Sequence, residues 1–234
     1  KIVTTVATHT PITLRREQEE NVGYTIDIFK RYDTMLWNCK MRYGKTVTAY
    51  ELIKRNKYQK TIVITHRPAV EDGWASDHDL IFGGTNHRFI DKTKDNRSYD
   101  ERMDTENDRQ INEAVASGVS FVYFASIQDL RGSQRVGGKF NKNNAVFDTD
   151  WDLLIVDEAH EGTSTSLGDA VIKELRKENT KILSLSGTPY NIMDGYEENV
   201  YTWTYVDEQE AKEKWGQTPA YKEHEEKTKQ YSKE

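Results

Sequence analysis

A phosphate-binding signature lies in residues 38–46, NCKMRYGKT, where a Gly-Lys-Thr triplet follows a short apolar run. The common loop has one glycine, four residues and then Gly-Lys-Ser/Thr, so that backbone amides wrap phosphates while the lysine and hydroxyl address the terminal phosphate and Mg²⁺. Gly44, Lys45 and Thr46 match this pattern, but Cys39 stands where the first glycine is expected. Because short motifs recur by chance, the triplet needs a second motif to support it.

An acidic pair supplies that second motif. In LLIVDEAH, residues 153–160, four apolar residues precede Asp157 and Glu158. This places both carboxylates at the carboxyl end of a strand, the edge at which α/β sheets bind ligands. One carboxylate can hold Mg²⁺, and the next can take a proton from an attacking water. Alone, such a pair would indicate a helix cap. Downstream of a phosphate loop, it favours nucleotide hydrolysis.

A third element follows at the end of the next apolar run, SLSGTP, residues 184–189. Ser186 and Thr188 carry small hydroxyls, Gly187 permits a tight backbone, and Pro189 stops the strand. By itself this is an ordinary turn. The ordered series of strand-GKT-helix, strand-DEAH and strand-SGTP is hard to produce by accident.

Composition limits the class of protein. The 234 residues are 35% hydrophobic, and 33 Lys and Arg against 39 Asp and Glu give a net charge of −6. These values predict a soluble globular protein and argue against a surface that binds polyanions everywhere, while a local basic groove stays possible. The single cysteine excludes an intrachain disulfide and fits the cytoplasm, and no apolar run is long enough to span a membrane. Because the chain begins at Lys1 rather than Met, we expect a piece of a longer protein.

Short apolar runs alternate with polar, helix-permissive stretches, which predicts a mainly parallel sheet covered by helices. The expected strands are 34–39, 60–65, 79–84, 119–126, 151–157 and 180–186, and the expected helices are 16–32, 45–56, 104–117 and 166–178. The alternation predicts one domain over 1–206 with a charged loop or insertion at 86–110. The Glu/Lys-rich segment 207–234 is expected to be a helix or tail leaving that domain.

With these three motifs, the chain resembles the superfamily 2 helicases and translocases, the DEAD/DEAH-type motors. The likeness covers most of residues 12–206, and MRYGKT, THRP, SIQDL and SGTP are most similar to the motor subunits of bacterial restriction enzymes. The resemblance implies the first RecA-like domain of such a motor, a three-layer P-loop NTPase fold that uses ATP and Mg²⁺ and acts on DNA.

Further motifs acquire roles only through this resemblance. LRREQ, residues 14–18, looks like a nucleotide-pocket motif in which Gln18 would read the adenine edge and Arg15 would support the pocket. THRPAVEDGW (65–74) and FASIQDLRG (124–132) look like nucleic-acid contact motifs. The candidate nucleic-acid-binding residues are Arg67, Ser126 and Gln128, each of which could instead be a surface or capping residue. Trp74, Trp151 and Trp203 are expected to pack rather than to stack on bases.

The catalytic roles follow the reaction. The helix that starts at Lys45 would aim its first amides at the phosphates, so an extended Cys39 is compatible with an altered but active loop. Lys45, with Mg²⁺ held by Thr46 and Asp157, would stabilise the γ-phosphate while Glu158 orients water. The expected nucleotide-binding loop residues are Arg42, Tyr43, Gly44, Lys45, Thr46 and Val47. Arg42 lies over the phosphates or pairs with a neighbouring carboxylate.

Coupling between nucleotide and nucleic acid is implied for His160 and for the turn Ser186, Gly187 and Thr188, with an ordinary helix-start histidine as the alternative for His160. Superfamily 2 motors close ATP between two RecA-like lobes, and no second lobe follows within the chain. We therefore expect a weakly active or inactive fragment, with the second lobe and any nuclease or methyltransferase parts elsewhere in the parent protein. The rivals are a repair or RNA helicase, a non-hydrolysing nucleic-acid-binding or protein scaffold, and a small-molecule P-loop kinase.

Overall fold

The protein folds around a parallel sheet, seen in a computed structural model that describes residues 12–91, 101–159, 166–188 and 193–217. Within these residues the sheet has seven strands in the order β3-β4-β2-β5-β6-β1-β7, and each neighbouring pair is parallel. The strands are β1 (Thr34–Cys39), β2 (Lys60–Thr65), β3 (Arg88–Ile90), β4 (Phe121–Ser126), β5 (Leu153–Asp157), β6 (Lys181–Ser186) and β7 (Val200–Trp203). The expected α/β class with a parallel sheet is confirmed.

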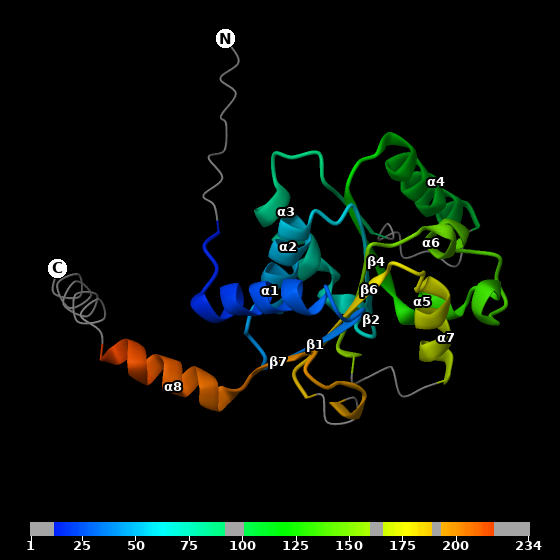
Figure 1. Cartoon of the computed structure of the whole chain (residues 1–234). Helices are drawn as coiled ribbons and strands as arrows, with labels where there is room; N and C mark the ends of the chain where they lie inside the picture. The colour runs from blue at the N-terminus through cyan, green and yellow to red at the C-terminus, as the bar shows by residue number, and fades with distance from the viewer. Residues whose placement is uncertain (1–11, 92–100, 160–165, 189–192, 218–234) are drawn as a thin grey trace, which may run out of the picture.

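Helices cover both faces of the sheet (Figure 1). The α-helices are α1 (Arg16–Ile28), α2 (Lys45–Asn56), α3 (Glu71–Phe82), α4 (Glu101–Ser117), α5 (Ile127–Arg131), α6 (Asn144–Asp148), α7 (Ser166–Leu175) and α8 (Tyr205–Gly216). Short 3₁₀ turns are η1 (Pro68–Val70), η2 (Gln134–Val136) and η4 (Met193–Gly195). None of the helices in the described ranges is long and apolar enough to cross a membrane.

The two faces bury separate hydrophobic clusters, because successive side chains of a strand point to opposite sides. On β5, Leu153 and Ile155 join the cluster beneath α1, α2 and α3, whereas Leu154 and Val156 join the one beneath α4 to α7. Both faces of the central strands are therefore apolar, which explains their continuous hydrophobic runs. The result is the three-layer arrangement that the sequence predicts.

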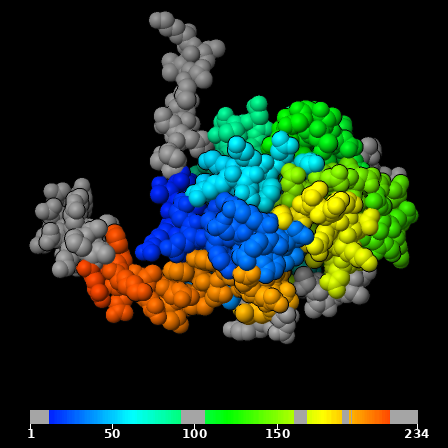
Figure 2. All heavy atoms as spheres, viewed as in Figure 1, coloured from blue at the N-terminus to red at the C-terminus, as the bar shows by residue number. Residues whose placement is uncertain are grey.

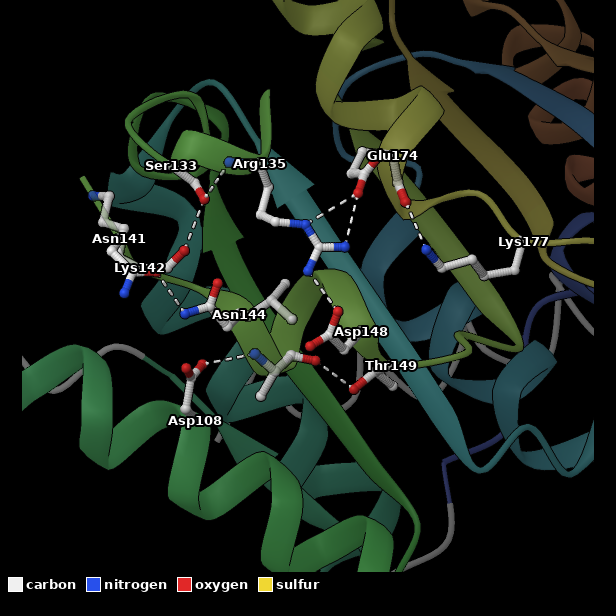
Figure 3. A network of polar contacts seen from close by, with 12 residues as sticks. Asp108, Ser133, Arg135, Asn141, Lys142, Asn144, Asp148, Thr149, Glu174 and Lys177 are labelled. Atoms are coloured by element: carbon white, nitrogen blue, oxygen red, sulfur yellow. Dashed lines mark hydrogen bonds and ion pairs between the residues drawn. The ribbon is translucent and has the colours of Figure 1, made fainter. Parts of the chain in front are cut away.

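A polar network fastens the layer of α6 and α7 (Figure 3). Arg135 of η2 forms ion pairs with Asp148 of α6, at 2.5 Å, and with Glu174 of α7, at 2.9 Å. The Arg135 guanidinium also lies 5.9 Å from the centre of the Phe147 ring. Asp108 of α4 accepts a hydrogen bond from the amide of Ala145 near the start of α6. These contacts join η2 to α6 and α7, and α4 to α6.

One expectation about the segment after β2 is wrong. Residues 79–84 do not form a strand, because Asp79–Phe82 are the last turn of α3. Trp74, His78 and Phe82 recur every four residues and are the buried residues of that helix, a helical period that the short apolar run hides. The stretch 86–110, expected as a charged loop or insertion, contains β3 and the first part of α4. The side of α4 facing the core includes Ile111 and Ala114.

The end of the domain contains a strand that the alternation of apolar runs did not predict. β7 pairs in parallel with β1, from Leu36 opposite Val200 to Cys39 opposite Trp203. The helix α8 then begins at Tyr205, with Thr204 as its N-cap. All of α8 is described and none of its residues is buried, and it extends outward along the edge of the molecule (Figures 1 and 2). Residues 218–234, the rest of the segment expected to leave the domain, lie outside the described part.

Candidate functional site

The candidate residues gather at one edge of the sheet. Parallel strands end at the same edge, and there Thr65 of β2 lies opposite both Ser126 of β4 and Asp157 of β5. On the other side of β5, Ser186 of β6 lies opposite Asn38 of β1. The segments that leave β1, β2, β4, β5 and β6 therefore begin side by side, as the ligand-binding edge of an α/β sheet requires. His160 lies outside the described residues.

The segment between β1 and α2 has the backbone of a phosphate loop. Gly44, the N-cap of α2, has a φ of 85°, and Arg42 has a φ of 64°. The amide of Thr48 makes a 3.1 Å bond to the carbonyl of Gly44 as the helix begins. The three amides before Thr48 precede this first helical bond, and such amides bind anions at helix N-termini. The Lys45 side chain points back toward β1, and its Nζ donates a hydrogen bond to the carbonyl of Cys39 at 3.1 Å.

Only one of the two usual glycine positions of the loop has a backbone conformation that requires glycine. Cys39 is the last residue of β1, extended and fully buried, and burial raises the pKa of its thiol to about 12. An extended strand residue needs no glycine. At Gly44, by contrast, φ is in the left-handed region, and a Cβ would lie 2.8 Å from Nε2 of Gln18. The expected altered loop is therefore compatible with the fold.

Two residues of the LRREQ segment, Arg15 and Gln18, form hydrogen bonds with the loop. The backbone carbonyl of Tyr43 accepts hydrogen bonds from the Arg15 guanidinium and from Nε2 of Gln18, the latter at 3.0 Å. Oε1 of Gln18 accepts from the amide of Arg15 at 2.9 Å. Each polar atom of the Gln18 amide has capacity for one further bond. Arg15 and Gln18 are thus placed beside the loop, as the resemblance implies.

The side chain of Tyr43, an expected residue of the nucleotide-binding loop, is buried within the domain. Its ring is 1% exposed, and its hydroxyl donates to the carbonyl of Glu17 at 3.0 Å. The Trp203 ring of β7 lies 6.5 Å from it. The Tyr43 side chain therefore anchors the loop to α1 and β7, and only its backbone borders the candidate site. The tertiary position of β7 decided this, and that strand was not predicted.

Asp157 and Glu158 stand at the end of β5 with different backbone geometry. Asp157 is buried, its Oδ1 accepts from the amide of Glu158 at 3.1 Å, and its Oδ2 accepts from Nε1 of Trp74 at 3.0 Å. Glu158 has a φ of 52°, which is uncommon for a residue with a side chain and costs about 1–2 kcal/mol. Such strain is typical of functional positions. Sequence reasoning assigned Trp74 to packing alone and missed its contact with Asp157.

The turn after β6 lies against the phosphate loop. Oγ of Ser186 accepts a hydrogen bond from the amide of Thr188 at 3.1 Å, which closes the turn. A Cβ built on Gly187 would lie 3.7 Å from the carbonyl oxygen of Cys39 and 4.0 Å from the amide of Met41. The SGTP motif and the GKT motif, distant in sequence, are therefore in contact range of one another.

The nucleic-acid candidates lie at the other side of β5. Nε2 of Gln128 donates to the carbonyl of His66 at 3.2 Å, which joins α5 to the residue before Arg67. Arg67 and Gln128 are exposed. Ser126 caps α5, since its hydroxyl accepts from the amide of Asp129 at 3.2 Å. The structure thus brings the three candidates together and gives Ser126 a capping contact as well.

The donor set fits a magnesium nucleotide. Lys45 supplies an ammonium group, Thr46 a hydroxyl and Asp157 a carboxylate, and Mg²⁺ is commonly held by one or two carboxylates together with substrate phosphates. Arg42 is exposed, and both of its expected roles stay predictions.

The chain matches a known protein family over most of its length. Residues 11–191 match the model of the family described as type III restriction enzyme, res subunit. The chain belongs to this family. The res-subunit match covers the phosphate loop, the acidic pair and the SGTP turn, so the expected resemblance to superfamily 2 motors of restriction enzymes is confirmed.

A curated relative supports the same assignment. The res-family chain is 25% identical over 249 residues to a Mycoplasma pneumoniae protein named as a type II restriction enzyme and methyltransferase, RM.MpnORF110P C-terminus. The match covers 86% of the chain and 32% of the relative. The chain therefore spans about a third of the length of this curated relative.

Solved structures share the fold. The SWI2/SNF2 ATPase core of Sulfolobus solfataricus in complex with dsDNA has a TM-score of 0.56 at 18% identity, covering 82% of the res-family chain and 36% of that protein. The Hef helicase domain of Pyrococcus furiosus has a TM-score of 0.52 at 16% identity, with 82% and 40% covered. The type ISP restriction-modification enzyme LlaBIII bound to DNA gives 0.50 at 19%, with 77% and 13% covered. The expected RecA-like α/β fold is thereby confirmed.

Proposed function

We propose that this domain binds ATP with Mg²⁺ at the edge formed by the β1–α2 loop, the end of β5 and the turn after β6. The observation that supports it most is the position of Gly187, where a Cβ would lie 3.7 Å from the carbonyl oxygen of Cys39, the same atom that Lys45 contacts. Two motifs predicted separately from sequence, GKT and SGTP, thus lie beside each other, and the strand of the acidic pair ends at the same edge of the sheet. Lys45 would bind the terminal phosphates and Thr46 and Asp157 would hold the metal. Bound Mg²⁺ would neutralise charge on those phosphates.

Hydrolysis would depend on Glu158 as the group that orients water and accepts its proton. The left-handed backbone of Glu158 turns the chain sharply just after Asp157, so adjacent carboxylates need not share one direction. Arg15 and Gln18 would hold the nucleotide side of the loop. The backbone of Tyr43, together with Gly44, Val47 and Arg42, would line it. Ser186, Gly187 and Thr188 would relay nucleotide state, with His160 as a further candidate.

We propose DNA as the partner, contacted through Arg67, Ser126 and Gln128. Backbone contacts position a strand without reading its sequence and need scattered cations, amides and hydroxyls rather than a net positive chain. Two similar structures have DNA in their descriptions, the SWI2/SNF2 core and LlaBIII. A repair or RNA helicase is the rival within the same class, and a non-hydrolysing scaffold is the rival outside it.

We also propose that the parent is a cytoplasmic restriction-type enzyme with a second RecA-like lobe, and with nuclease or methyltransferase parts elsewhere. The partial coverage of the M. pneumoniae relative and of both archaeal structures supports this. Because superfamily 2 motors close ATP between two lobes, the 234-residue chain would bind nucleotide weakly and turn it over poorly. Activity is therefore best measured in the parent protein.

The test is a salt series of ATPase rate and nucleic-acid affinity in the parent protein, on duplex DNA, single-stranded DNA and RNA. Log affinity should fall by roughly 0.7–0.9 per neutralised phosphate for each tenfold rise in salt. Arg67→Ala should weaken binding to all sequences and flatten the slope by about one such unit. Arg16→Ala is the control, since that side chain is 91% exposed on α1 and pairs with Glu20. Stimulation by RNA alone would favour the RNA-helicase rival.

A further inference from the structure

Trp74 makes a contact with the proposed metal-binding carboxylate that packing does not require. The indole is 1% exposed, and its Nε1 donates a hydrogen bond to Oδ2 of Asp157 at 3.0 Å. Oδ1 of the same carboxylate accepts from the amide of Glu158. One donor on each oxygen fixes the plane of the carboxylate. An indole N–H is a donor only, so it orients the carboxylate without competing as a ligand.

The indole is itself held by the helix that follows the phosphate loop. The Tyr50 ring of α2 meets the Trp74 ring edge to face, with centres 5.4 Å apart and planes at 75°. The Tyr50 hydroxyl donates to the backbone carbonyl of Trp74 at 2.7 Å. α2 is the helix that begins with Lys45 and Thr46. Trp74 is therefore fixed to α2 at one end and to the carboxylate of β5 at the other.

Trp74 also belongs to the segment that carries a proposed nucleic-acid contact. It lies in the first turn of α3, and η1 joins that helix to Arg67. The sequence places Trp74 seven residues after Arg67. If η1 or the start of α3 moved, the Trp74 side chain would transmit the movement to the Asp157 carboxylate.

We propose that Trp74 is a positioning residue that orients the Asp157 carboxylate for Mg²⁺ and links it to the segment of Arg67. This inference rests on the proposed nucleotide site. A charged acceptor makes the hydrogen bond stronger than one between neutral groups. Outer partners of metal ligands typically contribute 10–100-fold in metal affinity. If Trp74 served packing alone, Trp74→Phe would leave the affinity for Mg²⁺ unchanged, because phenylalanine keeps an aromatic ring and lacks only the N–H donor.

The test uses the 234-residue chain and a fluorescent ADP, titrated in EDTA and over a Mg²⁺ series. Trp74→Phe should leave affinity in EDTA unchanged and raise the Mg²⁺ concentration that gives half of the maximal increase in nucleotide affinity by roughly 10–100-fold. The matched control is Trp151→Phe, which removes another buried indole bond, to the carbonyl of Val146 at 2.8 Å, just before the amino end of β5. An equal Mg²⁺ requirement in wild type and Trp74→Phe would overturn the proposal.

A spectroscopic measurement on the wild-type chain guards against a variant that fails to fold. The indole N–H signal of Trp74 should shift when Mg²⁺ and ADP are added together, whereas the Trp151 signal stays in place. Lack of a shift at Trp74 with nucleotide bound would contradict the positioning role but leave the nucleotide site intact. A wild-type chain and a parent protein that both bind no nucleotide would instead reject the proposed function, and this inference with it.

Discussion

Lys45 donates a hydrogen bond from Nζ to the backbone carbonyl of Cys39 at 3.1 Å. This contact joins the end of β1 to the start of α2 and closes the loop on itself. It also fixes the ammonium group of the first residue of α2 within the loop, and the N-terminal amides of a helix bind anions. A phosphate with negative charge should attract the ammonium more strongly than a neutral carbonyl does.

We expect Lys45→Ala to weaken binding of ATP with Mg²⁺ by roughly 10–100-fold, because a hydrogen bond to a charged group contributes about 1.5–3 kcal/mol. Titration of a fluorescent ATP analogue into the chain measures this. Lys54→Ala is the control, since Lys54 lies in the last turn of the same helix and is exposed. Equal affinity of wild type and Lys45→Ala would remove the lysine from the site.

We expect Glu158→Gln in the parent protein to preserve ATP binding and to lower turnover by about 10²–10⁴-fold. The amide keeps the shape of the side chain but cannot accept a proton from water. Glu178→Gln, an exposed change after α7, should have no effect. Steady-state ATPase rates with saturating DNA provide the measurement, and near-normal turnover in Glu158→Gln would refute its role as the base.

We expect Gly44→Ala to lower the free energy of unfolding by at least about 1–2 kcal/mol. The residue has a φ of 85°, and the added methyl would meet Gln18 at 2.8 Å. Gly23→Ala is the matched control, because Gly23 lies within α1 with open space around it. That change should raise the free energy of unfolding by roughly 0.5–1 kcal/mol. Urea denaturation of both variants tests the pair, and a stabilised Gly44→Ala would contradict the loop geometry.

We expect the stability of the chain to fall as the pH drops below about 6.5, partly through a buried histidine pair. Nε2 of His78 and Nδ1 of His87 lie 2.8 Å apart, and burial lowers the pKa of His87 to about 4 and that of His78 below its usual value. Between pH 6.5 and 4 the unfolded chain binds protons that the native pair does not, so acid favours unfolding.

His87→Gln tests this directly. The amide retains a donor and an acceptor for His78 but does not titrate in this range. Denaturation midpoints measured from pH 7.5 to 4.5 should fall more steeply with decreasing pH in the wild type than in the variant. Parallel curves would show that the pair does not contribute to the acid sensitivity.

Local sequence patterns determined the fold class and the positions of most central strands. The runs 34–39 and 60–65 are strands with the expected bounds, because a strand buried on both faces must be apolar throughout. The three motifs were predicted at strand ends, and parallel strands carry such ends to one edge whatever the details of packing. The Leu175 and Val171 face of α7 is buried, as its spacing predicts.

Tertiary structure decided what depends on partners distant in the chain. Residues 79–82 are helical because His78 and Phe82 pack against Tyr50 of α2, and no local pattern contains that contact. β7 forms because it pairs with the edge of β1 that β6 leaves free. Trp203 of β7 then packs near the Tyr43 ring and helps to bury it. The hydrogen bond from Trp74 to Asp157 joins residues 83 positions apart. Periodicity reports which side chains are buried, whereas the direction of an indole N–H is fixed only when both helices and the sheet have packed.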